Sequence, residues 1–108
     1  MKTEDEIAIE LSDRVVEVSR SAIETFGVEC QLMKSIEELA ELGASLCRYL
    51  VDPDSLSNLA SVHEELADVT IMTTQLNMIM DDESVCEVIR EKLDRLESKI
   101  AEEKKGDG

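Results

Sequence analysis

Aromatic residues, proline and glycine are scarce in this chain of 108 residues. Phe26 and Tyr49 are its only aromatic residues, and one proline and four glycines leave little material for turns. A fold built from strands needs many turns, so this scarcity favours helices. Hydrophobic residues still make up 43% of the chain, too many for a disordered acidic tail. We therefore expect one folded helical domain with an aliphatic core of Leu, Ile, Val, Met and Ala.

Positive charge is also scarce. The chain has 11 Lys and Arg against 26 Asp and Glu, a formal net charge of −15. An autonomous nucleic-acid-binding module needs a basic face against phosphates, and a binder of anionic membranes needs the same. The composition therefore predicts neither a nucleic-acid partner nor a membrane partner. No apolar run approaches the roughly 18 residues of a membrane span.

Cysteine and histidine are too few for a disulfide framework or a zinc site. Cys30, Cys47 and Cys86 are odd in number and form no CxxC pair, and His63 is the one histidine. We expect each cysteine to be a buried small apolar residue in a reducing compartment. The charged N-terminus has no apolar segment behind it, which is unlike a signal peptide. These features predict a cytoplasmic protein.

Apolar spacing of three and four residues predicts four helices, over 3–25, 28–51, 61–80 and 83–104. We expect Gly27 to end the first helix, and Pro53 to break the pattern so that 52–60 forms a linker. Ser61 and Glu64 match a capping box at the start of the third helix. The pattern predicts a single helical domain over 1–105 and a flexible tail over 106–108.

Four acidic residues repeat one spacing on the second and third helices. Glu38 and Glu41 lie one turn apart, as do Glu65 and Asp68. Glu65 falls within the apolar arc of its helix, where a charge is costly unless something pairs with it. No basic residue of these segments is well placed to neutralise them, whereas a divalent cation would. Oxygen ligands suit Mg²⁺ first and Mn²⁺ second, and His63 is misplaced for a di-iron site.

The order and spacing of these residues resemble a known family. Glu37-Glu38-Leu39-Ala40-Glu41 is followed, after 23 residues, by Glu65-Leu66-Ala67-Asp68. This is similar to the EExxE and ExxD motifs of MazG-like, all-α nucleoside triphosphate pyrophosphohydrolases, and the resemblance covers about residues 25–100. It implies a four-helix MazG-like bundle that assembles as a homodimer or a dimer of dimers. It also implies Mg²⁺-dependent hydrolysis of a (deoxy)nucleoside triphosphate to the monophosphate and pyrophosphate.

The resemblance assigns roles to seven residues. It implies that Glu38, Glu41, Glu65 and Asp68 bind the metal, that Glu37 orients or deprotonates the attacking water, and that Lys92 and Arg95 contact phosphate. Four alternatives stay open at this point. The acidic residues can instead form a solvated helix face, and Lys92 and Arg95 can pair with acidic neighbours on their own helix. The substrate can be phosphoribosyl-ATP, or the chain can be a non-catalytic acidic interaction module of the same fold.

A second feature of the sequence also predicts that the chain forms oligomers. Several helices carry apolar residues outside their main stripe, among them Ile9, Val16 and Ile71. A chain of this size has room for only a limited core. We expect another subunit to cover these side chains.

Overall fold

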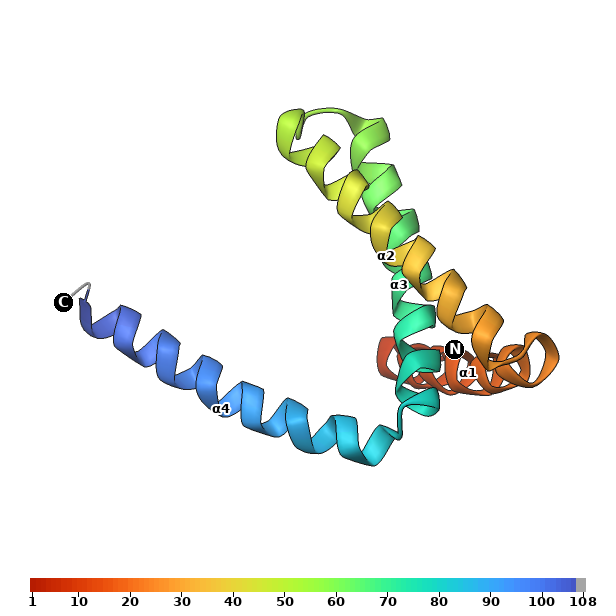
Figure 1. Cartoon of the computed structure of the whole chain (residues 1–108). Helices are drawn as coiled ribbons and strands as arrows, with labels where there is room; N and C mark the ends of the chain where they lie inside the picture. Colours follow the sequence, from red (N-terminus) through yellow and green to blue (C-terminus); the bar gives the residue numbers. More distant parts are fainter. Residues whose placement is uncertain (107–108) are drawn as a thin grey trace.

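The chain folds into four α-helices in a computed structural model that describes residues 1–106, and this part of the chain holds no strand (Figure 1). The all-α prediction is confirmed. The helices are α1 (Glu4–Phe26), α2 (Val28–Val51), α3 (Leu56–Ile79) and α4 (Asp82–Gly106). α4 includes Gly106, the first residue of the predicted tail, and the other two residues of that tail lie outside the described part.

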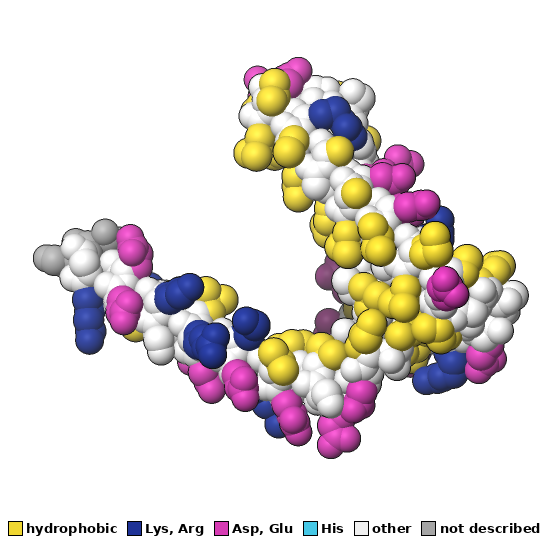
Figure 2. Space-filling view, in the orientation of Figure 1, with side chains coloured by type: hydrophobic (Ala, Val, Ile, Leu, Met, Phe, Trp, Pro, Cys, Tyr) yellow, Lys and Arg dark blue, Asp and Glu magenta, His cyan; other side chains and the backbone are white. Residues whose placement is uncertain are grey.

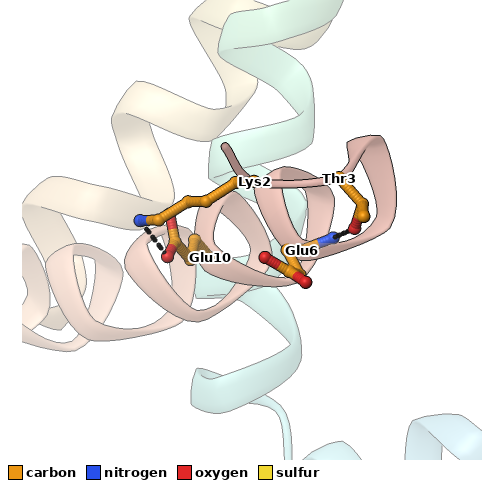
Figure 3. Close-up of polar contacts among 4 residues, drawn as sticks. All are labelled: Lys2, Thr3, Glu6 and Glu10. Carbon is orange, nitrogen blue, oxygen red and sulfur yellow. Dashed lines mark hydrogen bonds and ion pairs between the residues drawn. The ribbon is translucent and has the colours of Figure 1, made fainter.

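Both ends of α1 follow from local chemistry. The Thr3 hydroxyl accepts a hydrogen bond from the backbone N–H of Glu6 and caps the helix (Figure 3). Lys2 forms an ion pair with Glu10 across the same first turns. At the other end, Gly27 has a φ of 90° and donates its N–H to the Ile23 carbonyl. A side chain at Gly27 would be strained at that φ, so glycine ends α1 there as predicted.

The predicted linker over 52–60 is wrong in its second half. α3 begins at Leu56, and the Ser55 hydroxyl caps it by accepting the Asn58 N–H at 3.2 Å. The Asn58 side chain also ties this corner to α2 by donating to the Arg48 carbonyl. Ser61, the predicted cap, lies inside the helix, where its hydroxyl accepts a hydrogen bond from Ser45. Pro53 ends α2, but the next helix restarts sooner because Ser55 is an equally good cap.

α2 and α3 form a long antiparallel pair, and α1 crosses one end of it (Figure 1). α1 packs against both helices of the pair. α4 leaves that same end as a separate arm, and among the described residues it packs closely only against α3. One chain is therefore a three-helix body with a fourth helix projecting from it.

Burial in the single chain is mostly polar. Val69 and Met72 are the only buried hydrophobic residues in the described part, at 8% and 4% exposure. The buried polar residues outnumber them and are Ser19, Gln31, Ser35, Glu38, Ser45 and Gln75. The buried hydrophobic residues are of the predicted aliphatic kinds, but the apolar core of one chain is small. Many other residues of the predicted apolar stripes are exposed, because three packed helices cannot enclose all of them.

The cysteine prediction is wrong for a similar reason. Cys30, Cys47 and Cys86 are all exposed free thiols. The packing of the described helices leaves each of them open to solvent. None of the described helices has a stretch long and apolar enough to cross a membrane.

Candidate metal centre

The contact between α2 and α3 is lined by polar side chains along its length. At one end, the Gln31 amide donates to the Gln75 side-chain oxygen at 2.7 Å. Near the other end, the Ser45 hydroxyl donates to that of Ser61 at 2.9 Å. We call this line of facing residues the polar seam. Small or hydrogen-bonded polar groups let two helices pack closely without burying unsatisfied atoms.

Three carboxylates meet in the middle of the polar seam. Glu38 of α2 faces Glu65 and Asp68 of α3, and one oxygen from each lies within 4.8 Å of the others. We call these three residues the acidic cluster. The 3-residue spacing of Glu65 and Asp68 puts both on the side of α3 that meets α2. The antiparallel register fixed by the Gln31–Gln75 and Ser45–Ser61 bonds then sets Glu38 opposite them.

Two oxygens of the acidic cluster lack a partner. Glu38 is only 7% exposed, and Glu65 is half-buried. Among the described residues, Glu38 Oε2 and Glu65 Oε2 are buried without any hydrogen bond. Buried carboxylate oxygens are normally paired, since leaving them bare costs free energy. A bound cation or ligand between the two helices would give these oxygens a partner.

The surroundings of the cluster disfavour negative charge. The pKa of Glu38 is raised above its ordinary value, first by burial and then by the nearby charges of Asp68 and Glu41. The pKa of Glu65 is also raised, first by burial and then by Glu41, which lies beside it. Crowded, desolvated carboxylates repel one another until a cation neutralises them. Glu41 itself is exposed, at the edge of the cluster.

One basic residue lies closer to the cluster than the sequence reasoning allowed. Lys34 Nζ is 3.5 Å from Glu38 Oε1, and it partly opposes the upward shift in the Glu38 pKa. The expectation that no base is well placed here is therefore wrong for Glu38. The signal was present in the sequence, because Lys34 and Glu38 are four residues apart on one helix. The Lys34 side chain is half exposed, so this pair is only a partial neutralisation.

The other predicted site residues lie apart from the cluster. Glu37 is exposed and lines a surface groove with Phe26, Met33 and Lys34. It therefore borders the side of α2 from which Lys34 reaches Glu38. Lys92 and Arg95 are exposed on α4, which within residues 1–106 packs closely only against α3. Within the described chain, no ion pair joins either residue to an acidic neighbour on its own helix.

The cluster fits a hard divalent cation by the chemistry of its donors. Three carboxylates on stiff helices each contribute an oxygen, buried oxygens of two of them lack partners, and no sulfur or imidazole ligand lies among them. Such a set suits Mg²⁺ or Mn²⁺, which accept carboxylate oxygens and keep some of their waters. Glu38, Glu65 and Asp68 would hold the ion, with Glu41 next to Glu65. The predicted four ligands thus divide into three that meet and one at the edge.

No protein-family model, curated protein or solved structure matches the chain. What the fold and the site define is an all-helical protein with an acidic cluster between two antiparallel helices.

Proposed function

We propose that the chain is a Mg²⁺-dependent nucleoside triphosphate pyrophosphohydrolase of the MazG-like kind. The observation that carries this proposal is the meeting of Glu38, Glu65 and Asp68 across the polar seam. These are three of the four predicted metal ligands, all of which belong to the two motifs that suggested the activity. A structural role for three adjacent carboxylates would be unfavourable, since like charges at this separation repel one another.

In this proposal, the role of each acidic residue follows from its position in the cluster. Glu38, Glu65 and Asp68 would hold the cation, and Glu41 would complete the set from the edge of the cluster. When bound, Mg²⁺ supplies Lewis-acid stabilisation of phosphoryl oxygens and lowers the pKa of a bound water. Because the chain has a net charge of −15, it would take up the nucleotide as its metal complex rather than by attraction of the free anion.

Lys34 and Glu37 would act next to the cluster. Lys34 is half exposed and turned to Glu38, so it can exchange that carboxylate for a phosphate oxygen of the substrate. Glu37 lines the adjoining groove with Lys34, where its carboxylate can accept a proton from water. In this proposal Lys34 neutralises charge that develops on the pyrophosphate, and Glu37 orients the water. Lys92 and Arg95 can contribute only if α4 of some chain lies near the site.

The test is release of pyrophosphate from a panel of NTPs and dNTPs with Mg²⁺, using wild type, Glu65→Gln and Glu64→Gln. Glu64 is the matched control, since it is the exposed neighbour of Glu65 on the same helix. We expect activity in wild type and in Glu64→Gln, and its loss in Glu65→Gln. Hydrolysis in ¹⁸O-labelled water should place the label in the monophosphate, as attack at the α-phosphorus requires.

Other outcomes would replace this proposal. Turnover of phosphoribosyl-ATP alone would assign the related activity on that substrate. Release of orthophosphate with a nucleoside diphosphate would mean a different reaction. No turnover of any of these compounds would leave a non-catalytic helical module and contradict the proposal.

A further inference from the structure

Lys34 is the one basic side chain of α2 and α3 that lies at the acidic cluster. These two helices together hold two basic residues, Lys34 and Arg48. Arg48 is ten residues beyond Glu38, which is about 15 Å along a helix. Six of the eleven basic residues lie on α4, which projects from the body as a separate arm (Figure 2). In the described part of the chain, Lys34 is also the only cation among the charged groups that act on Glu38 and Glu65.

The two carboxylate oxygens of Glu38 have different surroundings. Oε1 is 3.5 Å from the ammonium of Lys34, whose side chain is 55% exposed. Oε2 is buried and, within residues 1–106, has no hydrogen-bond partner. The Glu38 side chain as a whole is nine-tenths buried, and it lies beside Glu65 and Asp68. One ammonium at the solvent edge therefore faces three crowded carboxylates and pairs with a single oxygen of one of them.

The Lys34–Glu38 ion pair contributes little to the stability of α2. In pairs four residues apart on a helix, glutamate before lysine is more stabilising than lysine before glutamate, and this pair has the second order. A half-exposed ion pair is also weakened by solvent and by salt. Lysine has a flexible stem of four carbons, so its ammonium can move without any change in the helix. These properties suit a contact that breaks and forms again.

Open space lies next to the Lys34 side chain. Lys34 lines a surface groove of about 560 Å³ together with Phe26, Met33 and Glu37. Phe26 and Met33 are exposed, so movement of Lys34 into the groove displaces no packed side chain. A lysine ammonium is a compact point charge that binds phosphate oxygens. An anion in this groove would therefore lie within reach of Lys34 and next to Glu38.

We propose that Lys34 is a phosphate-binding residue that acts only when metal is bound. In the metal-free protein its ammonium is the counterion of Glu38, and it turns to a phosphate group of the nucleotide once a divalent cation is present. This inference rests on the proposed function, because it needs a cation at the acidic cluster. Lys34 is then repelled by the positive charge beside it, and Glu38 no longer needs the ammonium for its neutralisation.

This exchange of partners couples nucleotide binding to metal binding through one side chain. In the metal-free protein, Glu38 holds the ammonium and the neighbouring carboxylates repel a free triphosphate. With the cation bound, Lys34 adds a positive charge at the groove, where it can bind phosphate. The nucleotide therefore binds with the cation or after it, and not before it. Because linkage is reciprocal, a bound phosphate group should also tighten metal binding.

The experiment measures how fast an acetyl N-hydroxysuccinimide ester acetylates Lys34 in the full chain, with peptide mass spectrometry as the readout. Saturating Mn²⁺ should speed acetylation of Lys34 in wild type about two- to fivefold, the range expected for loss of a half-exposed ion pair. Lys99 is exposed on α4 and is in neither ion pair of the described residues, so its rate should not change. Glu65→Gln keeps the Lys34–Glu38 pair but lacks one cation ligand, so its Lys34 should stay slow in Mn²⁺.

Calorimetry of Lys34→Met gives a second readout. Mn²⁺ should bind this variant several-fold more tightly than wild type, because no ammonium competes for Glu38. Inorganic pyrophosphate, titrated in excess Mn²⁺, should bind it roughly tenfold more weakly, since one charge-assisted contact is lost. Lys99→Met is the matched control and should change neither affinity. A role in helix stability alone would alter the melting temperature of Lys34→Met but not its binding of pyrophosphate.

These measurements separate failure of this inference from failure of the proposed function. If wild type does not bind Mn²⁺, the metal centre is wrong and this inference is wrong with it. If wild type binds Mn²⁺ but Lys34 is acetylated at the same rate or more slowly, the metal centre stands and this inference is overturned. Equal binding of pyrophosphate by wild type and Lys34→Met would also overturn this inference alone.

Discussion

The polar seam and the apolar face of α4 are opposite solutions to helix packing. In the polar seam, Gln31–Gln75 and Ser45–Ser61 satisfy one another within the chain, and only the acidic cluster between them is left without partners. Among the described residues of α4, no buried polar side-chain atom lacks a hydrogen bond. Its aliphatic side chains are exposed instead. The difference indicates what each region needs. We propose that a cation satisfies the carboxylates of the seam, whereas exposed aliphatic side chains like those of α4 are satisfied by packing against another apolar surface.

The largest expected effect tests whether the body of one chain really has a small apolar centre. Met72 is 4% exposed, so Met72→Ala should remove about 2–5 kcal/mol from the free energy of unfolding, by loss of burial and formation of a cavity. Chemical denaturation measures the change. Met33 is exposed, and Met33→Ala should stay within about 0.5 kcal/mol. Equal costs for the two variants would contradict the burial described for α3.

The second prediction compares amide exchange in α4 and α1 as the protein is diluted. If α4 is covered only by another copy, amide exchange over 86–100 should speed up as the protein is diluted, roughly tenfold for each 1.4 kcal/mol of association free energy lost. Amides at the centre of α1, which packs within the chain, should change less. Hydrogen exchange with mass spectrometry at several concentrations reads both regions at once. Exchange of α4 that is fast and independent of concentration would argue against the covered face.

A smaller effect concerns the start of α3. Ser55→Ala should cost about 1 kcal/mol, because its hydroxyl caps the helix through the Asn58 N–H. Ser21 is an exposed serine inside α1, and Ser21→Ala should be neutral or slightly stabilising, since alanine favours helix. Denaturant midpoints of the two variants make the comparison. No cost at Ser55 would mean that the helix starts later, as the sequence suggested.

The smallest effect has the opposite sign. The pKa of Glu65 is raised in the folded chain, so the folded state binds its proton more tightly than the unfolded state does. Stability from this group is therefore present at low pH and is lost as pH rises from about 4.3, the ordinary Glu value, through the raised folded pKa. At neutral pH and without metal, Glu65→Gln should melt at a higher temperature than wild type. The difference should shrink in acid and should be absent for Glu64→Gln.

Much of the fold could be predicted from local signals. α2 has the predicted bounds because Gly27 and Pro53 stop helices for steric reasons that act within a few residues. The start of α3 was missed because two serines compete as caps, and the choice depends on the contact of Asn58 with Arg48. The orientation of α4 relative to the other helices could not be predicted from the sequence either. A heptad-like apolar line predicts that some helix covers it, but does not say which.

The candidate site divides in the same way. Glu65 on an apolar arc predicted a charge turned into the fold, and the structure puts it beside Glu38 and Asp68. The Lys34–Glu38 pair could be predicted from its local spacing of four residues, although one lysine cannot neutralise all four carboxylates. The spacing of Lys92 and Arg95 in the sequence could not show where they lie relative to the cluster. They are on α4, and its position depends on tertiary contacts that the apolar pattern does not specify.

The central claim is that the acidic cluster binds a divalent cation, and calorimetric titration of the metal-free protein with Mn²⁺ at neutral pH tests it most directly. Wild type and Glu64→Gln should bind Mn²⁺, and Mg²⁺ should compete for the same site. Glu65→Gln should show no binding under the same conditions while keeping its helical circular dichroism. Equal binding by wild type and Glu65→Gln, or heat from neither, would contradict the claim.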